Sequence, residues 1–363
     1  HREPAAADTL PTVWGFASKE GRAPLGMALV ASGMGSKKDP QGAAATTAAA
    51  ACRLFSNAFG RCSSDSLAVT EIPGSHGQSF PGLVHMSWAF IQTDLEELQN
   101  QPTPGSGLAF CGHEVAHQWW GNAVRPATYR DAWLSEGFAE YSGYLFVQQA
   151  TPGDAVFDGL LDQARRHILD NRRRALGRGV RAEPPISLGT RSTSSMNLGD
   201  YGLLIYEKGA WVLHMLRCML MDLRSGDESA FLNLMRDYYS RYRNAWVTTE
   251  DFRRVVEEHV GMDMGWFFDQ WVHGTDVPVY EFQAGWSPQA DGTYKVSGLI
   301  KQSEVPEGFQ AYPIIRIRFG EEGFYQVRVL ADKPHTTFTL AVPIEPVGVD
   351  FNDMNSVLAD VRE

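Results

Sequence analysis

The pattern of apolar residues changes at Pro278, and this change constrains the fold more than any other feature of the sequence. From Pro278 onwards, short segments separated by turns alternate apolar and polar side chains, as in AYPIIRIRFG and FYQVRVLA. Such alternation is typical of half-buried β-strands. We therefore predict that residues 278–363 form an antiparallel β-sandwich of six or seven strands.

The residues before Pro278 are mainly helical in pattern. Apolar helices are predicted at about 108–121, 132–149 and 202–223, and a further helix starts at the Thr248/Asp251 capping signal. Residues 66–74 alternate and favour a strand. A chain of 363 residues is also too long for one ordinary core. Together these patterns predict an α+β domain over residues 1–277, with the first 35 or so residues unassigned, followed by the β-sandwich.

Charge and hydropathy exclude two classes of partner. The net charge of -11 argues against nucleic acid, which proteins bind through Lys and Arg. No run of eighteen or more apolar residues occurs, so no segment is expected to span a membrane.

The chain begins with neither an initiator methionine nor a signal peptide, and we expect it to be part of a larger polypeptide. Its compartment stays open, with an extracytoplasmic one slightly favoured.

The four cysteines show neither CxxC spacing nor the pattern of a metal finger. Cys52 and Cys62 could form a disulfide in an oxidising compartment, but we expect buried free thiols.

The stretch CGHEVAHQWWGN, residues 111–122, contains the candidate metal ligands and the candidate general base. His113 and His117 lie four positions apart, so on a helix both imidazoles face one cation, and Glu114 beside them can take a proton from a metal-bound water. A catalytic zinc needs a third protein ligand. Glu136, nineteen positions after His117 on a second predicted helix, is the preferred candidate because Gly137 leaves room for close approach. Glu140 is the competing choice, and simple packing of both histidines is the alternative to a metal site.

These residues carry a family resemblance. HEVAHQWWGN followed by the glutamate of WLSEGFAEY resembles the aminopeptidase N and leukotriene hydrolase family of zinc metallopeptidases, as do YGLLIYEKGAWVLHML and WFFDQWVHGTDVPVYEF. The resemblance covers residues 50–363 and implies a thermolysin-like catalytic domain holding one Zn²⁺. It makes His113, His117 and Glu136 the zinc ligands, Glu114 the general base, and Tyr206 the hydroxyl that stabilises the oxyanion. A hydroxyl donor of this kind contributes about a hundred- to thousandfold in rate.

Three further residues are candidates for the surroundings of the zinc site. Tyr201 fits a family tyrosine near the site. Asp131 matches a family acid, which could bond a zinc-bound imidazole or, equally, serve a helix N-terminus. Glu140 remains either a ligand or a neighbour of the ligands.

The chain departs from the family where a Gly-x-Met-Glu-Asn strand normally places a glutamate on the substrate's free amine. The corresponding stretch is HGQSFPGLVHM, which puts Ser79 or Phe80 in place of the acid. Gln78 could supply one hydrogen bond but no charge. The backbone of residues 81–83 (Pro81, Gly82 and Leu83) is expected to line the cleft as an edge strand for an extended peptide.

Either another acid, such as Glu71 or Glu140, therefore replaces the missing one, or the enzyme needs no free N-terminus. We accordingly expect a zinc peptidase acting on peptides or proteins. By resemblance it is an aminopeptidase, with an endopeptidase or a narrow-specificity peptidase as the alternative. A non-catalytic peptide-binding module is the alternative from another class.

Overall fold

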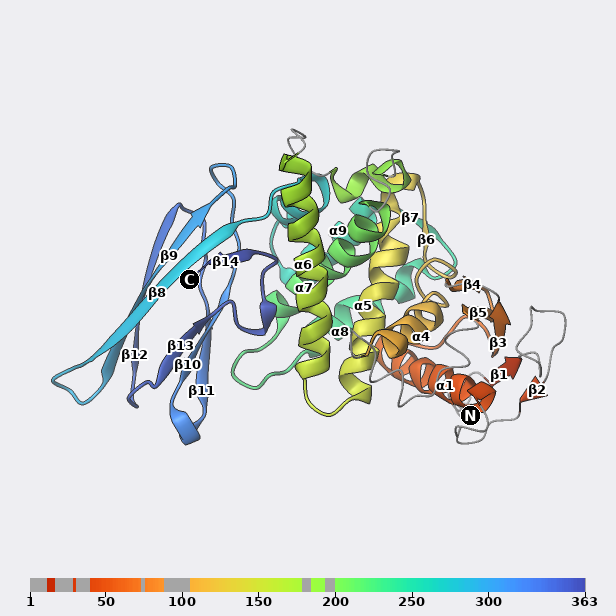
Figure 1. The fold of residues 1–363 in the computed structure, drawn as a ribbon, viewed down its shortest axis with the longest axis horizontal. Coiled ribbons are helices and arrows are strands. Elements are labelled where there is room, and N and C mark those ends of the chain that lie inside the picture. The colour runs from red at the N-terminus through yellow and green to blue at the C-terminus, as the bar shows by residue number, and fades with distance from the viewer. Residues whose placement is uncertain are drawn as a thin grey trace, which may run out of the picture.

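The computed structural model describes residues 12–16, 29–30, 40–72, 76–87, 105–177, 184–192 and 200–362. Along its longest axis, a small sheet near the N-terminus, a helical centre and the C-terminal sheets follow one another (Figure 1). One buried core runs through the helical centre and continues into the C-terminal strands, where it includes Tyr280, Ile300 and Leu358. The C-terminal sheets therefore pack on the helices through apolar side chains.

The first sheet has five strands in the order β2-β1-β3-β5-β4. Its members are β1 (Thr12–Phe16), β2 (Leu29–Val30), β3 (Ser66–Ile72), β4 (Gln78–Phe80) and β5 (Leu83–Ser87), and α1 (Pro40–Phe59) lies between β2 and β3 in the chain. Strand β4 forms one edge and pairs antiparallel with β5. The prediction that residues 81–83 form the edge strand is therefore wrong. Pro81 and Gly82 make the turn between β4 and β5, since Gly82 has a φ of 73°, which glycine adopts at no steric cost, and Leu83 begins β5.

The helical centre contains two helices that face each other closely, α4 (Ser106–Ala116) and α5 (Trp133–Ala150). A Cβ atom on Gly112 would lie 3.0 Å from the Cα of Gly143, so only glycines allow the two helices to come this near. Gly137 serves a different contact, since its added Cβ would lie 2.8 Å from the Cα of Gly209 at the start of α7. The room beside Glu136 thus serves helix packing and not the approach of a metal.

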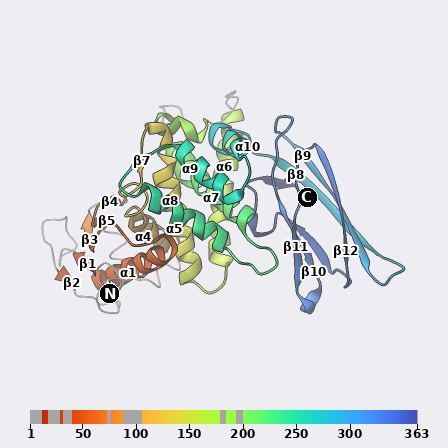
Figure 2. The same ribbon diagram turned by 180° about the vertical axis from the view of Figure 1, so that it is seen from behind.

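The other helical elements surround this pair (Figure 2). The predicted helix over 202–223 is divided into a π-helical segment, η3, and the α-helix α7. The remaining bounds are α6 (Ala155–Gly177), η3 (Gly202–Lys208), α7 (Gly209–Leu220), α8 (Ser229–Tyr242), α9 (Thr249–Val260), α10 (Gly265–Phe268) and η4 (Asp269–His273), with short 3₁₀ turns η1 (Tyr129–Asp131) and η2 (Ile186–Ser192) and a small two-stranded sheet of β6 (Arg125–Pro126) and β7 (Trp246–Val247).

Seven strands follow Pro278, in two sheets. Three strands are ordered β11-β10-β13 and four are ordered β12-β9-β8-β14. Strand β14 pairs parallel with β8, whereas the prediction expected antiparallel pairing throughout. The bounds are β8 (Val279–Pro288), β9 (Tyr294–Ser303), β10 (Ile314–Arg318), β11 (Phe324–Arg328), β12 (His335–Val342), β13 (Gly348–Phe351) and β14 (Asp360–Arg362), with 3₁₀ turns η5 (Gly320–Glu322) and η6 (Asp353–Asn355).

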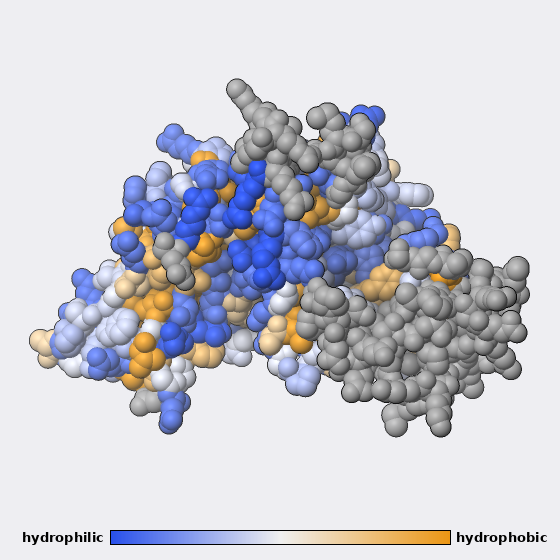
Figure 3. All heavy atoms as spheres, viewed as in Figure 1, coloured by the Kyte–Doolittle hydropathy of each residue, from blue (hydrophilic) through white to orange (hydrophobic). Residues whose placement is uncertain are grey.

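The molecular surface over the helical centre is largely hydrophilic on the face shown in Figure 3. Among the described residues, no helix combines the length and apolar character that crossing a membrane requires. All four cysteines are buried free thiols, as expected, so Cys52 and Cys62 form no disulfide here.

Candidate metal centre and active site

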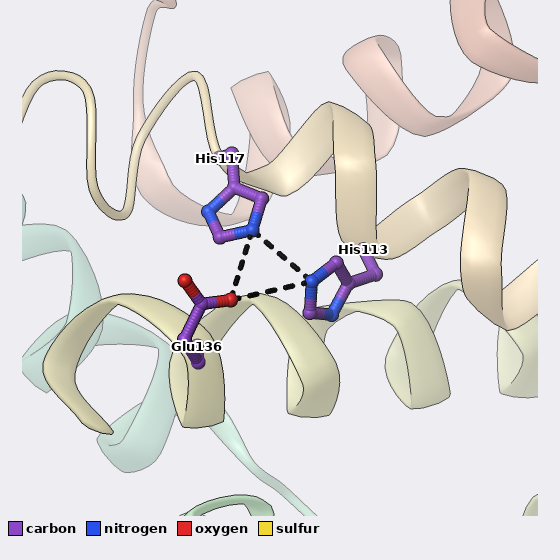
Figure 4. Close-up of side chains that lie close together, drawn as sticks. All are labelled: His113, His117 and Glu136. Carbon is purple, nitrogen blue, oxygen red and sulfur yellow. Dashed lines mark hydrogen bonds and ion pairs between the residues drawn. The ribbon is translucent and has the colours of Figure 1, made fainter. Parts of the chain in front are cut away.

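His113, His117 and Glu136 converge on one point between α4 and α5 (Figure 4). The Nε2 atoms of the two imidazoles are 3.1 Å apart, and Oε2 of Glu136 lies 3.6 Å from Nε2 of His113 and 3.2 Å from Nε2 of His117. Zinc bonds of 2.0–2.2 Å in tetrahedral geometry require donors about 3.3–3.6 Å apart. The spacing and the two-nitrogen, one-oxygen donor set therefore fit zinc.

Hydrogen bonds at the far side of each imidazole orient it toward this point. Nδ1 of His117 lies 2.9 Å from the backbone oxygen of Trp120, and Nδ1 of His113 lies 2.8 Å from Oε2 of Glu140. Because a carbonyl or carboxylate oxygen can only accept, both Nδ1 atoms carry the proton and both Nε2 lone pairs remain for a cation. Glu140, the competing candidate for third ligand, thus contacts the far side of His113 and not the point that His113, His117 and Glu136 share.

The negatively charged carboxylates around the imidazoles favour a bound cation. Burial disfavours a protonated His113, but the carboxylates of Glu136 and Glu140 outweigh this effect and raise the pKa of His113 to about 10. Burial also opposes ionisation of Glu136, yet the hydrogen bonds from His113 and His117 hold its pKa well below the usual range. A bound metal ion would take over the role of the proton on the imidazoles.

Glu114 is buried beside the ligands and is held by strand β4. Oγ of Ser79 lies 2.8 Å from Oε2 of Glu114 and 2.7 Å from its backbone oxygen, so the hydroxyl donates to Glu114. Gly77 covers the same carboxylate, because a Cβ atom there would lie 2.2 Å from Oε1. Ser79, which stands where the family's amine-binding acid was expected, therefore contacts the proposed base.

Two tyrosines of the η3 region lie near the ligands. The ring of Tyr206 stacks on the ring of His113, with centroids 5.5 Å apart and planes inclined by 6°. Burial and the nearby Glu136 raise the pKa of Tyr206, so its hydroxyl stays protonated and can donate. The ring of Tyr201 packs edge-on against Tyr206 at 5.9 Å, and Tyr201 does not line the cavity.

Asp131 lies at the N-terminus of α9. Among the described residues, it forms no hydrogen bond with an imidazole. Its Oδ1 accepts from the backbone nitrogen and the hydroxyl of Thr249, at 2.7 Å and 3.0 Å, and its Oδ2 accepts from Thr128. The carboxylate thereby anchors the first residue of α9 to the segment before α5. Of the two roles left open by the sequence, the helix N-terminus is the one observed, and the acid that accepts from Nδ1 of His113 is Glu140.

A cavity of about 780 Å³ opens onto these residues. Gln78 and Ser79, which were predicted to contact substrate, line it, whereas Pro81, Gly82 and Leu83 do not. The side chain of Glu71 lies outside the described residues.

Sequence reasoning missed Glu207, which lines the cavity directly after Tyr206. No sequence pattern marked it, because the segment was predicted as part of an ordinary α-helix over 202–223 and is observed as a π-helix.

Comparisons with known proteins agree with this geometry. Residues 93–271 match the model of the Peptidase family M1 domain. The chain is 28% identical over 167 residues to aminopeptidase N of Lactococcus lactis, covering 46% of this chain and 18% of that protein. It is 31% identical over 184 residues to the human aminopeptidase RNPEPL1, covering 47% of this chain and 23% of that protein. The matched part thus spans about a fifth of the length of these relatives.

The fold is also found in a solved structure. The crystal structure of Legionella pneumophila aminopeptidase A in complex with aspartic acid superposes with a TM-score of 0.63 at 16% sequence identity, and the match covers 88% of this chain and 34% of that one. The family match and the relatives lead to one conclusion: residues 93–271 contain a peptidase family M1 domain, and the chain is similar to proteins of the aminopeptidase N family.

Proposed function

We propose that this chain is the catalytic part of a zinc-dependent metallopeptidase of the aminopeptidase type, acting on peptides. The observation that carries the proposal is the convergence of His113, His117 and Glu136 with Glu114 beside them in one cavity. The aminopeptidase names of the relatives support the exopeptidase class. We further propose that the C-terminal sheets form a β-sandwich that follows a thermolysin-like catalytic unit.

The two histidines and Glu136 would hold one zinc ion. When bound, zinc supplies a Lewis acid that polarises the scissile carbonyl and makes water acidic enough to ionise near neutral pH. Glu114 takes the proton from the attacking water and delivers it to the leaving amine. The hydroxyl of Tyr206 donates a hydrogen bond to the oxygen that becomes negative. The exposed edge of β4 offers backbone groups to an extended peptide.

Ser79 favours one variation on this activity. Since its hydroxyl is directed at Glu114 and carries no charge, a substrate amine finds no acid at this position. Endopeptidase or narrow-specificity cleavage is therefore the second candidate, and the state of the substrate's N-terminus distinguishes the two.

The test is cleavage of a peptide library with free and acetylated N-termini by the zinc-loaded wild type and the Glu114→Gln variant. We expect the variant to lose about 10²–10⁴-fold in rate while it retains zinc, because only proton transfer is removed. Preference for free N-termini supports the aminopeptidase, and equal cleavage of both sets supports the endopeptidase. Equal inactivity of wild type and variant toward every peptide would refute catalysis and leave the binding module.

A further inference from the structure

The π-helix η3 directs two consecutive side chains, Tyr206 and Glu207, at the same cavity. Tyr206 stacks on His113 and belongs to the metal centre. Glu207 extends the lining toward α6, where Oε1 lies 3.0 Å from Nδ1 of His167. The cavity therefore has a carboxylate beyond those that the proposed mechanism uses.

The surroundings of Glu207 leave its charge poorly compensated. Oε2 is buried and forms no hydrogen bond with the described residues, and the side chain is only 23% exposed. Its hydrogen-bond partner among the described residues, His167, is 49% exposed and thus largely solvated. In agreement with this geometry, burial raises the pKa of Glu207 to about 7, although the contact with His167 lowers it.

The other carboxylates of the cavity already have partners. Glu136 and Glu140 contact the imidazoles, and Glu114 accepts from Ser79. Among the described residues that line the cavity, none is Lys or Arg. Lys208, the next residue along the chain, is buried and donates to the carbonyl of Gly274. A cation brought by a ligand would therefore meet a wall that holds acids and, among the described residues, no Lys or Arg side chain.

We propose that Glu207 is a specificity-determining residue that binds a cationic group of the peptide substrate within this cleft. The inference rests on the proposed peptidase function and names the substrate class. The cation is an alkylammonium or guanidinium group, supplied either by the free N-terminus or by a Lys or Arg side chain. It supplies the opposite charge to a carboxylate that its contacts with the described residues leave poorly compensated.

The test compares peptide pairs that differ only in one cation. One pair has a free or an acetylated N-terminus, and the others carry Lys or norleucine at one position on either side of the cleaved bond. kcat/KM is measured for the zinc-loaded wild type, Glu207→Gln, Glu207→Asp and the control Glu307→Gln, whose glutamate is exposed. Because a hydrogen bond to a charged group is strong, we expect the wild type to favour one cationic peptide about 10- to 100-fold.

Glu207→Gln should abolish that preference, Glu207→Asp should retain part of it, and Glu307→Gln should leave it unchanged. Collapse of the free-versus-acetylated preference identifies the substrate amine as the cation, and collapse of a Lys-versus-norleucine preference identifies a side chain. Identical preferences in the wild type and Glu207→Gln would overturn the subsite, while cleavage by the wild type would still support the peptidase.

Calorimetry separates the two proposals if the wild type cleaves nothing. The same peptide pairs are titrated into Glu114→Gln and into the Glu114→Gln/Glu207→Gln double variant, both zinc-loaded. Tighter binding of the cationic member by the single variant alone supports the subsite. Equal binding of both members by both variants overturns it, independently of catalysis.

Discussion

Replacing Glu207 by Gln should make the protein more stable at alkaline pH, although it removes a charge from the cleft. Burial raises the pKa of Glu207 to about 7 from its ordinary value of 4.5. Between these pH values the folded protein binds more protons than the unfolded chain, so Glu207 lowers the stability of the wild type as the pH rises. Gln keeps an acceptor for His167 but cannot ionise.

The magnitude follows from the two pKa values. Their separation, from 4.5 to about 7, corresponds to about 3 kcal/mol at a pH above both. Because 23% of the side chain remains exposed, solvent screens part of this cost and we expect a gain of about 1–3 kcal/mol. Near pH 4.5 most of the gain should vanish, because the folded wild type then carries a neutral carboxyl group.

Thermal unfolding from pH 4.5 to 8 is the assay, with saturating zinc in every sample so that metal binding cancels in the comparison. At about 2–4 °C per kcal/mol, Glu207→Gln should unfold a few degrees to about 10 °C above the wild type at pH 8. The exposed Glu307→Gln control should show no such pH-dependent difference. A constant or falling difference between Glu207→Gln and the wild type across this pH range would refute the account of a poorly compensated acid.

Four other substitutions separate metal binding, catalysis and stability. Glu140→Gln should weaken zinc affinity about 10- to 100-fold in chelator competition, and unchanged affinity would exclude its support of a ligand. Asp131→Ala should cost about 1–3 kcal/mol in denaturant unfolding by leaving buried donors at the start of α9 unpaired, without a loss of zinc affinity. Gly77→Ala should displace the Glu114 carboxylate and lower kcat by about a hundredfold at full zinc content. Tyr206→Phe should lower kcat about 10²–10³-fold with little change in KM, and a loss confined to KM would contradict oxyanion stabilisation.

Much of the centre could be predicted because it depends on local periodicity. Two histidines four positions apart face the same way on any α-helix, so the sequence predicted the pair on α4. The capping box at Thr248 and Asp251 and the stop at Gly261 likewise depend on neighbouring residues, and both ends of α9 agree with the prediction. Alternation after Pro278 indicated strands for the same reason, although it could not give the parallel pairing of β14 with β8.

What the sequence by itself determined was therefore the set of candidate metal-binding side chains and the helices that carry them. The tertiary structure decided the roles of the acids, because these depend on contacts between distant segments. Glu136 and Glu140 lie one turn apart on one helix, and only the packing of α4 on α5 directs one at both Nε2 atoms and the other at Nδ1 of His113. Glu207, on a π-helical segment that no residue pattern indicated, lines the cleft only because the chain folds η3 against it.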